Sequence, residues 1–159
     1  KLHGYRRSLC IYSHVHRGTP QRPGLVLGLD RGGSCVGLAF RVPGDLHDQV
    51  IGYLRERELV TNVYLERRLG IRLDDGNMVE AVTYVADRHH RQYAGTLDVA
   101  RAAQIISGAA GQSGPNDAYV LSTINRLREL GIRDHWLEGV ARHLPPRGAS
   151  DSQQSANGL

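Results

Sequence analysis

The chain of 159 residues has two cysteines and no long hydrophobic run. No apolar stretch approaches the roughly 20 residues needed to cross a bilayer, and the start does not resemble a signal peptide, so no membrane association is expected. A disulfide framework in a small secreted protein needs more cysteines. Cys10 and Cys35 lie in strand-like apolar stretches. We therefore expect reduced, buried thiols and a cytoplasmic location.

Lysine is nearly absent as well, because Lys1 is the only one, although the formal net charge is +4. Several of the arginines stand beside acids, as in RERE at residues 55–58 and ERR at residues 66–68. No Lys/Arg block and no aromatic RNA-binding motif occurs. A mixed-charge surface is therefore the favoured interpretation, and no nucleic-acid partner is expected.

The first half of the chain has mainly strand patterns, in which apolar and small residues alternate. A tight turn is expected at residues 31–33 and a two-residue hairpin turn at Asp75-Gly76. Strands are predicted at residues 8–14, 24–30, 34–42, 60–73 and 78–86.

Helical periodicity begins at Leu46, from which Val50 and Leu54 recur at every fourth position. This spacing predicts an amphipathic helix whose apolar stripe faces the core. Gly111 and Gly131 are expected to end two later helices in a left-handed conformation. These later helices are predicted at residues 97–110, 117–130 and 133–144.

The order of these elements, with one helix inserted among strands and the other helices following, predicts an α+β fold. We expect a small mixed sheet curled toward a barrel, with helices packed on it. The length suits one domain. We place this domain at residues 1–144 and a disordered tail at residues 145–159, which contain almost no apolar residue.

Glu58 is the most informative polar residue, because it continues the every-fourth-residue spacing of the helical stripe. A carboxylate at the end of a core-facing stripe is partly removed from water, which favours its use as a base near neutral pH. On spacing alone, a surface glutamate paired with Arg55 or Arg57 is the commoner arrangement.

Other candidate residues carry weaker signals. The loop at residues 17–24 (RGTPQRPG) could build a binding site or serve as a rigid connection. Tyr119 could point its hydroxyl into a pocket or simply pack. His14 and His16 alternate near a strand end, and residues 89–90 are both histidine, but alternating or adjacent histidines of this kind are more often surface groups than metal ligands. We expect no metal site.

Several segments together resemble the ChaC family of γ-glutamylcyclotransferases. They follow the family's order and spacing from Leu2 to about Leu144, nearly all of the part expected to be ordered. The motifs that carry the resemblance are GYRRSLC at residues 4–10, HRGTP at 16–20, PGLVL at 23–27, GSCVG at 33–37, YLRERE at 53–58, YAG at 93–95 and GQSGPNDAY at 111–119.

The resemblance implies the cyclotransferase barrel and an enzyme that cleaves glutathione to 5-oxoproline and Cys-Gly. It implies that Glu58 is the catalytic base, and that Tyr119, Asn116, Arg17 and Gly18 bind the substrate. No cofactor or metal is implied, and we expect a monomer whose partner is a small molecule. The alternatives are a cyclotransferase acting on other γ-glutamyl compounds and a non-catalytic regulatory or interaction protein.

The chain departs from the family pattern at its start. Family members begin with a strand that carries a Tyr-Gly-Ser-Leu motif, whose amides and serine hold the γ-glutamyl group. No such motif occurs here, and the first residue is Lys1. We therefore expect this sequence to be a fragment of a longer protein that lacks its first strand.

Overall fold

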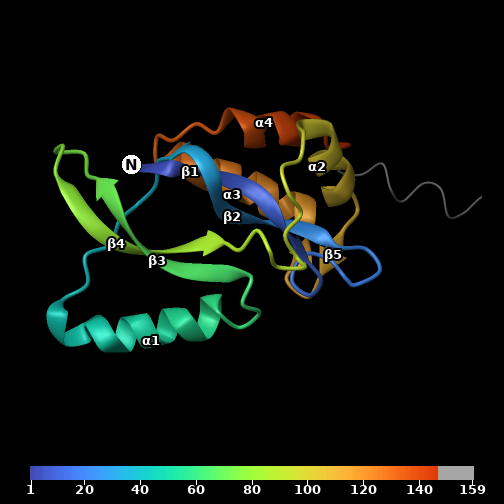
Figure 1. Ribbon diagram of the computed structural model, residues 1–159. Helices are drawn as coiled ribbons and strands as arrows, with labels where there is room; N and C mark the ends of the chain where they lie inside the picture. The colour runs from blue at the N-terminus through green and yellow to red at the C-terminus, as the bar shows by residue number, and fades with distance from the viewer. Residues whose placement is uncertain (147–159) are drawn as a thin grey trace, which may run out of the picture.

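Four strands close a small barrel in the order β1-β2-β4-β3 in the computed structural model, which describes residues 1–146 (Figure 1). The strands of the barrel are β1 (Leu2–Ser13), β2 (Gly24–Cys35), β3 (Tyr64–Arg72) and β4 (Met78–Ala86). The other elements are a short 3-10 helix (Gly44–Leu46), α1 (His47–Glu58), α2 (Val99–Ile106), the short strands β5 (Ala110–Gly111) and β6 (Gly114–Pro115), α3 (Asn116–Glu129) and α4 (His135–Arg142).

The barrel is a mixed sheet, as the sequence predicted. Strand β1 runs antiparallel to β2 along most of its length, and β3 runs antiparallel to β4. Strands β2 and β4 are parallel and meet at Leu29 and Val85. The β3–β4 hairpin turns at the predicted Asp75-Gly76, where Gly76 has a φ of 88°. The α+β class and the barrel are thus confirmed.

Helices α2, α3 and α4 gather on one side of β1 and β2 (Figure 1). They bury a common apolar core with the two strands, to which Leu9, Leu25, Ile106, Val120 and Leu137 contribute. Burial of this apolar surface is what holds the helices to the sheet.

The ends of these helices follow their local sequence. Asp98 and Asp134 cap α2 and α4 by accepting hydrogen bonds from backbone amides of the first turn. Gly131 has the positive φ (69°) expected just after α3. The prediction for Gly111 was wrong, because α2 already ends at Ile106 and Gly108 supplies the left-handed residue (φ 69°).

The predicted strand at residues 34–42 is wrong, and so is the turn before it. Gly32 and Gly33 adopt positive φ values (101° and 68°), yet β2 continues through them to Cys35, which pairs with Leu2 of β1. Residues 36–43 form no strand. Apolar residues alternate in this segment, but no strand among the described residues pairs with it. Leu38 is therefore 60% exposed and Phe40 83% exposed.

Helix α1 forms where the spacing predicted it, and Val50, Leu54 and Glu58 of the predicted stripe are half-buried, whereas most of the other residues of the helix are exposed. None of its residues is fully buried, and Leu46, just before it, is 43% exposed. The helix lies beside the β3–β4 hairpin, away from the other helices (Figure 1). Arg55 of α1 forms an ion pair with Glu66 of β3 at 2.8 Å.

The residue range of the predicted domain stays a prediction. The predicted tail at residues 145–159 lies almost wholly outside the described residues, which end at residue 146. Within residues 1–146, no helix has the length and apolar character needed to span a bilayer.

Candidate active site

Glu58 is the last residue of α1 and is half-buried. Within residues 1–146, its carboxylate forms no hydrogen bond or ion pair with a protein group, so the surface pairing with Arg55 or Arg57 does not occur. Arg55 binds Glu66 instead, and Arg57 binds the hydroxyl of Tyr53. The carboxylate of Glu58 is therefore left available to a ligand.

Two tyrosines lie close enough to Glu58 to sense its charge. The pKa of Tyr64 is raised, first by burial, then by Tyr119 and Cys10, and also by Glu58. The pKa of Tyr84 is raised by burial and by Glu66, with a smaller contribution from Glu58. The loop after α1 brings the chain back to Tyr64 through Asn62, which has a positive φ (55°) that asparagine tolerates better than most residues.

Tyr119 stands in the first turns of α3 and reaches strand β2. Its hydroxyl accepts a hydrogen bond from the amide of Leu27 at 3.2 Å. The guanidinium carbon of Arg17 lies 5.2 Å from the centre of the Tyr119 ring, a cation–π distance. Burial raises the pKa of Tyr119, while the Leu27 amide and the charge of Arg17 oppose that change. Two of the predicted site residues, Arg17 and Tyr119, are thus in contact.

Gly18 occupies a position where the backbone is packed too tightly for a side chain. A Cβ at Gly18 would fall against the nitrogen of Gly24 and within 2.6 and 2.7 Å of the carbonyl oxygens of Ser13 and Arg22. Arg17 binds the carbonyl oxygen of Ser113 at 2.5 Å. The loop between β1 and β2 is therefore a rigid support for Arg17.

Asn116 is fully buried at the start of α3. Its side-chain oxygen accepts a hydrogen bond from the amide of Leu25 at 2.7 Å, and its side-chain nitrogen donates one to the carbonyl oxygen of Leu25 at 2.8 Å. This pair of bonds fixes the start of α3 to β2 and so positions Tyr119 relative to that strand. A direct contact between Asn116 and a ligand stays a prediction.

Tyr64, at the start of β3, is a site residue that the sequence did not single out. Its hydroxyl donates a hydrogen bond to the carbonyl oxygen of Leu27 at 2.8 Å. The strand pattern placed Tyr64 in a strand but offered no reason to choose it over its neighbours. Its closeness to Glu58 along the chain is the one signal that could have identified it.

A hollow of about 510 Å³ lies beside Arg17 and Tyr119, and neither Glu58 nor Tyr64 is among the described residues that line it. Its lining includes Arg17, Tyr119, Ser122, Thr123 and Arg126, which carry two guanidinium groups and three hydroxyls, and Arg126 pairs with Glu129 at 2.7 Å. A second hollow, of about 430 Å³, is lined in part by Arg6, Arg7 and Arg133, but each of these arginines already pairs with a carboxylate. Of these five arginines, only Arg17 forms no ion pair with a carboxylate among the described residues, so the first hollow is the better place for an acidic small molecule.

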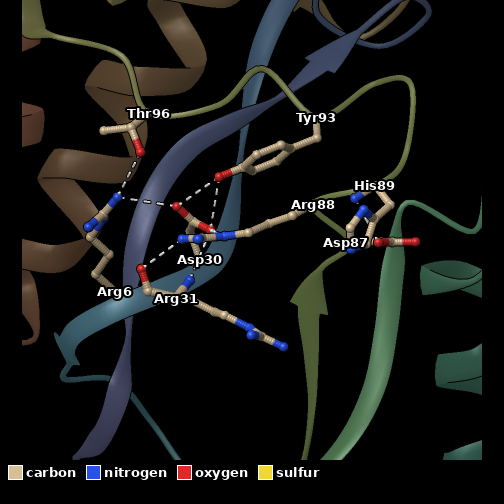
Figure 2. Close-up of polar contacts among 8 residues, drawn as sticks. All are labelled: Arg6, Asp30, Arg31, Asp87, Arg88, His89, Tyr93 and Thr96. Carbon is tan, nitrogen blue, oxygen red and sulfur yellow. Dashed lines mark hydrogen bonds and ion pairs between the residues drawn. The ribbon is translucent and has the colours of Figure 1, made fainter.

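A separate polar cluster surrounds Asp30 of β2 (Figure 2). The carboxylate receives hydrogen bonds from Arg88 at 2.8 Å, from Arg6 at 3.2 Å and from the hydroxyl of Tyr93 at 3.2 Å. Burial raises the pKa of Asp30, but the bonds from Arg88, the Arg31 amide and Tyr93 outweigh it, so the pKa is lowered. Because every oxygen of this carboxylate is bound, we assign it to holding β1, β2 and residues 88–96 together.

No three side chains among the histidines, cysteines, aspartates and glutamates of residues 1–146 gather as a metal site would require. The described residues supply one half-buried carboxylate, that of Glu58, and two half-buried phenols, those of Tyr64 and Tyr119, with the guanidinium group of Arg17 against the Tyr119 ring. The fold is an α+β barrel, and a carboxylate with neighbouring phenols is the kind of group that can take part in proton transfer.

A family model described as ChaC-like protein matches residues 1–145, so the chain belongs to the ChaC-like family. A glutathione-specific γ-glutamylcyclotransferase of Escherichia coli K12 is 34% identical over 139 residues, which cover 87% of this chain and 60% of that protein. The enzyme of the same name from Schizosaccharomyces pombe is 31% identical over 150 residues, covering 81% of this chain and 72% of that protein.

The fold matches a crystal structure of a yeast γ-glutamyl cyclotransferase specific to glutathione. The TM-score is 0.76 at 19% identity, and the match covers 90% of this chain and 86% of the yeast chain. At that identity the likeness shows the fold alone. The chain spans 60% of the length of the Escherichia coli relative.

Proposed function

We propose that this protein is a γ-glutamylcyclotransferase that converts glutathione to 5-oxoproline and Cys-Gly. The observation that carries the proposal is the half-buried carboxylate of Glu58, which has no protein partner in residues 1–146 and lies beside Tyr64. The names of the Escherichia coli and Schizosaccharomyces pombe relatives support the choice of glutathione.

The reaction is an intramolecular acyl transfer. The nitrogen of the free α-amine attacks the γ-carbonyl carbon of the same glutamyl unit, forming the five-membered ring of 5-oxoproline. The γ-amide C–N bond breaks, and Cys-Gly leaves as an amine. An α-amine has a pKa of about 8, so near neutral pH much of it is protonated and needs a base. No water, metal or covalent enzyme intermediate is consumed or formed.

Glu58 would serve as base and then as acid. Its carboxylate accepts a proton from the α-amine and returns it to the leaving nitrogen, so that protons balance over the cycle. The attacking nitrogen and the carbonyl belong to one molecule, so the protein has only to hold the folded rotamer and stabilise the oxyanion. Tyr119 and Arg17 are the described groups that we assign to binding the oxygens of the γ-glutamyl unit.

Arg17 and Gly18 take different parts in this proposal. Arg17 offers its guanidinium group beside the Tyr119 ring, and Gly18 permits the tight loop that holds Arg17 in place. Asn116 contributes by fixing α3 to β2. We further propose that residues 1–144 form the catalytic domain, that the protein is a monomer without a nucleic-acid partner, and that it works in the cytoplasm, where its two free cysteines would stay reduced.

A competition assay tests the proposal. The full-length protein is given glutathione, γ-glutamyl-alanine and an α-linked glutamyl dipeptide, and 5-oxoproline is measured. We expect turnover of glutathione and none of the α-linked peptide, because its amide is on the wrong carbon for ring closure. Turnover of γ-glutamyl-alanine at the glutathione rate would favour the broader γ-glutamyl substrate class. Turnover of the α-linked peptide would exclude the mechanism, and formation of no 5-oxoproline from any substrate would favour a non-catalytic role.

A further inference from the structure

Two phenols from distant parts of the chain bind the same residue of β2. Tyr64 of β3 and Tyr119 of α3 both form hydrogen bonds with the backbone of Leu27. The Leu27 carbonyl oxygen can only accept, so Tyr64 must donate to it at 2.8 Å. The Leu27 amide can only donate, so Tyr119 must accept from it at 3.2 Å. The backbone of Leu27 therefore orients the two hydroxyls in opposite senses.

This orientation decides what each hydroxyl can offer to a ligand. A phenol has one proton to donate and lone pairs with which to accept. Tyr64 has given its proton to Leu27, so only its lone pairs remain. Tyr119 has used a lone pair, and within residues 1–146 no protein acceptor takes its proton. Tyr64 is thus an acceptor and Tyr119 a donor, although both carry the same chemical group.

Tyr64 is also the phenol of the pair on which the charge of Glu58 acts. Tyr64 has the other phenol as its neighbour, because both bind Leu27, and Glu58 precedes Tyr64 by six positions in the chain and makes the smallest of the contributions that raise its pKa. Burial is the largest cause of the raised pKa of Tyr64 and of Tyr119, so both phenols stay neutral near pH 7. Both side chains are half-buried, which leaves part of each open to a ligand.

We propose that Tyr64 is a further substrate-contacting residue, which accepts a hydrogen bond from the α-amino group of the γ-glutamyl unit while Tyr119 donates one to an oxygen of that unit. The inference rests on the proposed function and adds to it which phenol binds the amine of the substrate and which binds an oxygen. An amine held on Tyr64 lies beside Glu58, so its proton passes to that carboxylate and the freed lone pair attacks the γ-carbonyl.

The test compares glutathione with glutaryl-Cys-Gly, an analogue that lacks only the α-amino group and cannot cyclise. For Tyr64→Phe we expect kcat/KM for glutathione to fall about tenfold or more, the cost of a hydrogen bond to a charged or polarised group. The inhibition constant of the analogue should stay within about twofold of the wild-type value, because the analogue has no amine to lose. Tyr119→Phe should weaken the binding of the analogue and of glutathione alike, since both molecules keep the oxygens to which Tyr119 donates.

Tyr84→Phe is the matched control, because Tyr84 also senses Glu58 but its hydroxyl binds Glu66 and not Leu27. This control should change neither measurement by more than about twofold. The proposed contact is wrong if Tyr64→Phe weakens binding of the analogue as much as it lowers kcat/KM for glutathione, or if it changes neither quantity. Wild-type protein that forms no 5-oxoproline overturns the proposed function separately. In that case the proposed contact is tested by calorimetry. If the contact exists, wild-type protein binds glutathione more tightly than the analogue, and Tyr64→Phe removes this difference in affinity.

A second variant guards against misfolding of Tyr64→Phe. Fluorotyrosine placed at position 64 keeps the shape and the bond to Leu27 but makes the phenol oxygen a poorer acceptor. We expect this variant to lower kcat/KM for glutathione and to leave the inhibition constant of the analogue unchanged. Fluorotyrosine at position 119, where the hydroxyl acts as a donor, should not weaken either ligand. An equal loss of glutathione binding from fluorotyrosine at both positions would overturn the assignment of Tyr64 as acceptor and Tyr119 as donor.

Discussion

The side chain of Arg88 donates a hydrogen bond to Asp30 across 2.8 Å, although 58 residues separate them in the chain. The Asp30 side chain is completely buried, whereas 40% of the Arg88 side chain is exposed. Arg6 binds the other carboxylate oxygen from the neighbouring strand (Figure 2). A buried carboxylate of this kind is tolerated only because its partners surround it.

Replacing Asp30 by asparagine should lower the free energy of unfolding by about 2–3 kcal/mol, because it leaves two arginines without their buried counter-charge. Urea denaturation measures the loss. Asp48→Asn is the control, since the Asp48 side chain is fully exposed and pairs only with His47 among the described residues. A change at Asp30 no larger than that at Asp48 would contradict the structural role of this cluster.

The contribution of Asp30 should depend on pH in a defined direction. Its pKa is lower in the folded protein than the value of about 4 expected for an unfolded chain, so its stabilising effect is fully present above about pH 4. The effect is lost as the pH falls through the folded value. The stability difference between wild type and Asp30→Asn should therefore shrink below about pH 4, and a difference that grows on acidification would have the wrong sign.

Gly18→Ala should destabilise the protein by at least about 2 kcal/mol, because the new methyl group meets backbone atoms that cannot move aside. Thermal melting and urea denaturation measure the effect. Gly44→Ala is the matched control, since a methyl group at Gly44 would meet no described atom within 4 Å beyond its chain neighbours, and its φ is not positive. Equal stability of the two variants would show that the loop at residues 17–24 is not the rigid support described above.

The two cysteines should differ in reactivity. Cys10 has no exposed surface, and burial, followed by the charge of Asp30, raises the pKa of its thiol to about 12. Because the thiolate is the reactive form, native protein at pH 8 should be alkylated at the partly exposed Cys35 and spared at Cys10. Mass spectrometry after iodoacetamide treatment, with and without urea, measures this. Alkylation of both thiols at the same rate in the native protein would contradict the buried position of Cys10.

Local patterns predicted the elements that depend on local chemistry. Asp75-Gly76 closes the β3–β4 hairpin, and β4 runs over the predicted residues 78–86 because its turn and its apolar run agree. Gly131 follows α3 as expected. Helix α1 begins one residue after Leu46, where the predicted periodicity starts, and Glu58 is its last residue.

The features that the sequence did not reveal depend on partners far away in the chain. The alternation at residues 34–42 resembles a strand, but a strand also needs a neighbour to pair with, and periodicity says nothing of one. The spacing in α1 could not show how shallowly that helix packs. Asp30 and Tyr64 take their roles from contacts with residues 58 and 37 positions away, which no local pattern encodes.

Replacement of Glu58 by glutamine tests the account most directly. Glutamine keeps the size of the side chain and its hydrogen bonding but cannot accept a proton, and the fold should survive because Glu58 binds no protein group in residues 1–146. Formation of 5-oxoproline from glutathione by the full-length protein should fall about a hundredfold or more, the usual contribution of a general base. Glu56→Gln, on the exposed face of the same helix, should keep wild-type turnover. Glu58→Gln protein that folds and retains more than about a tenth of that turnover would remove Glu58 from the role of base.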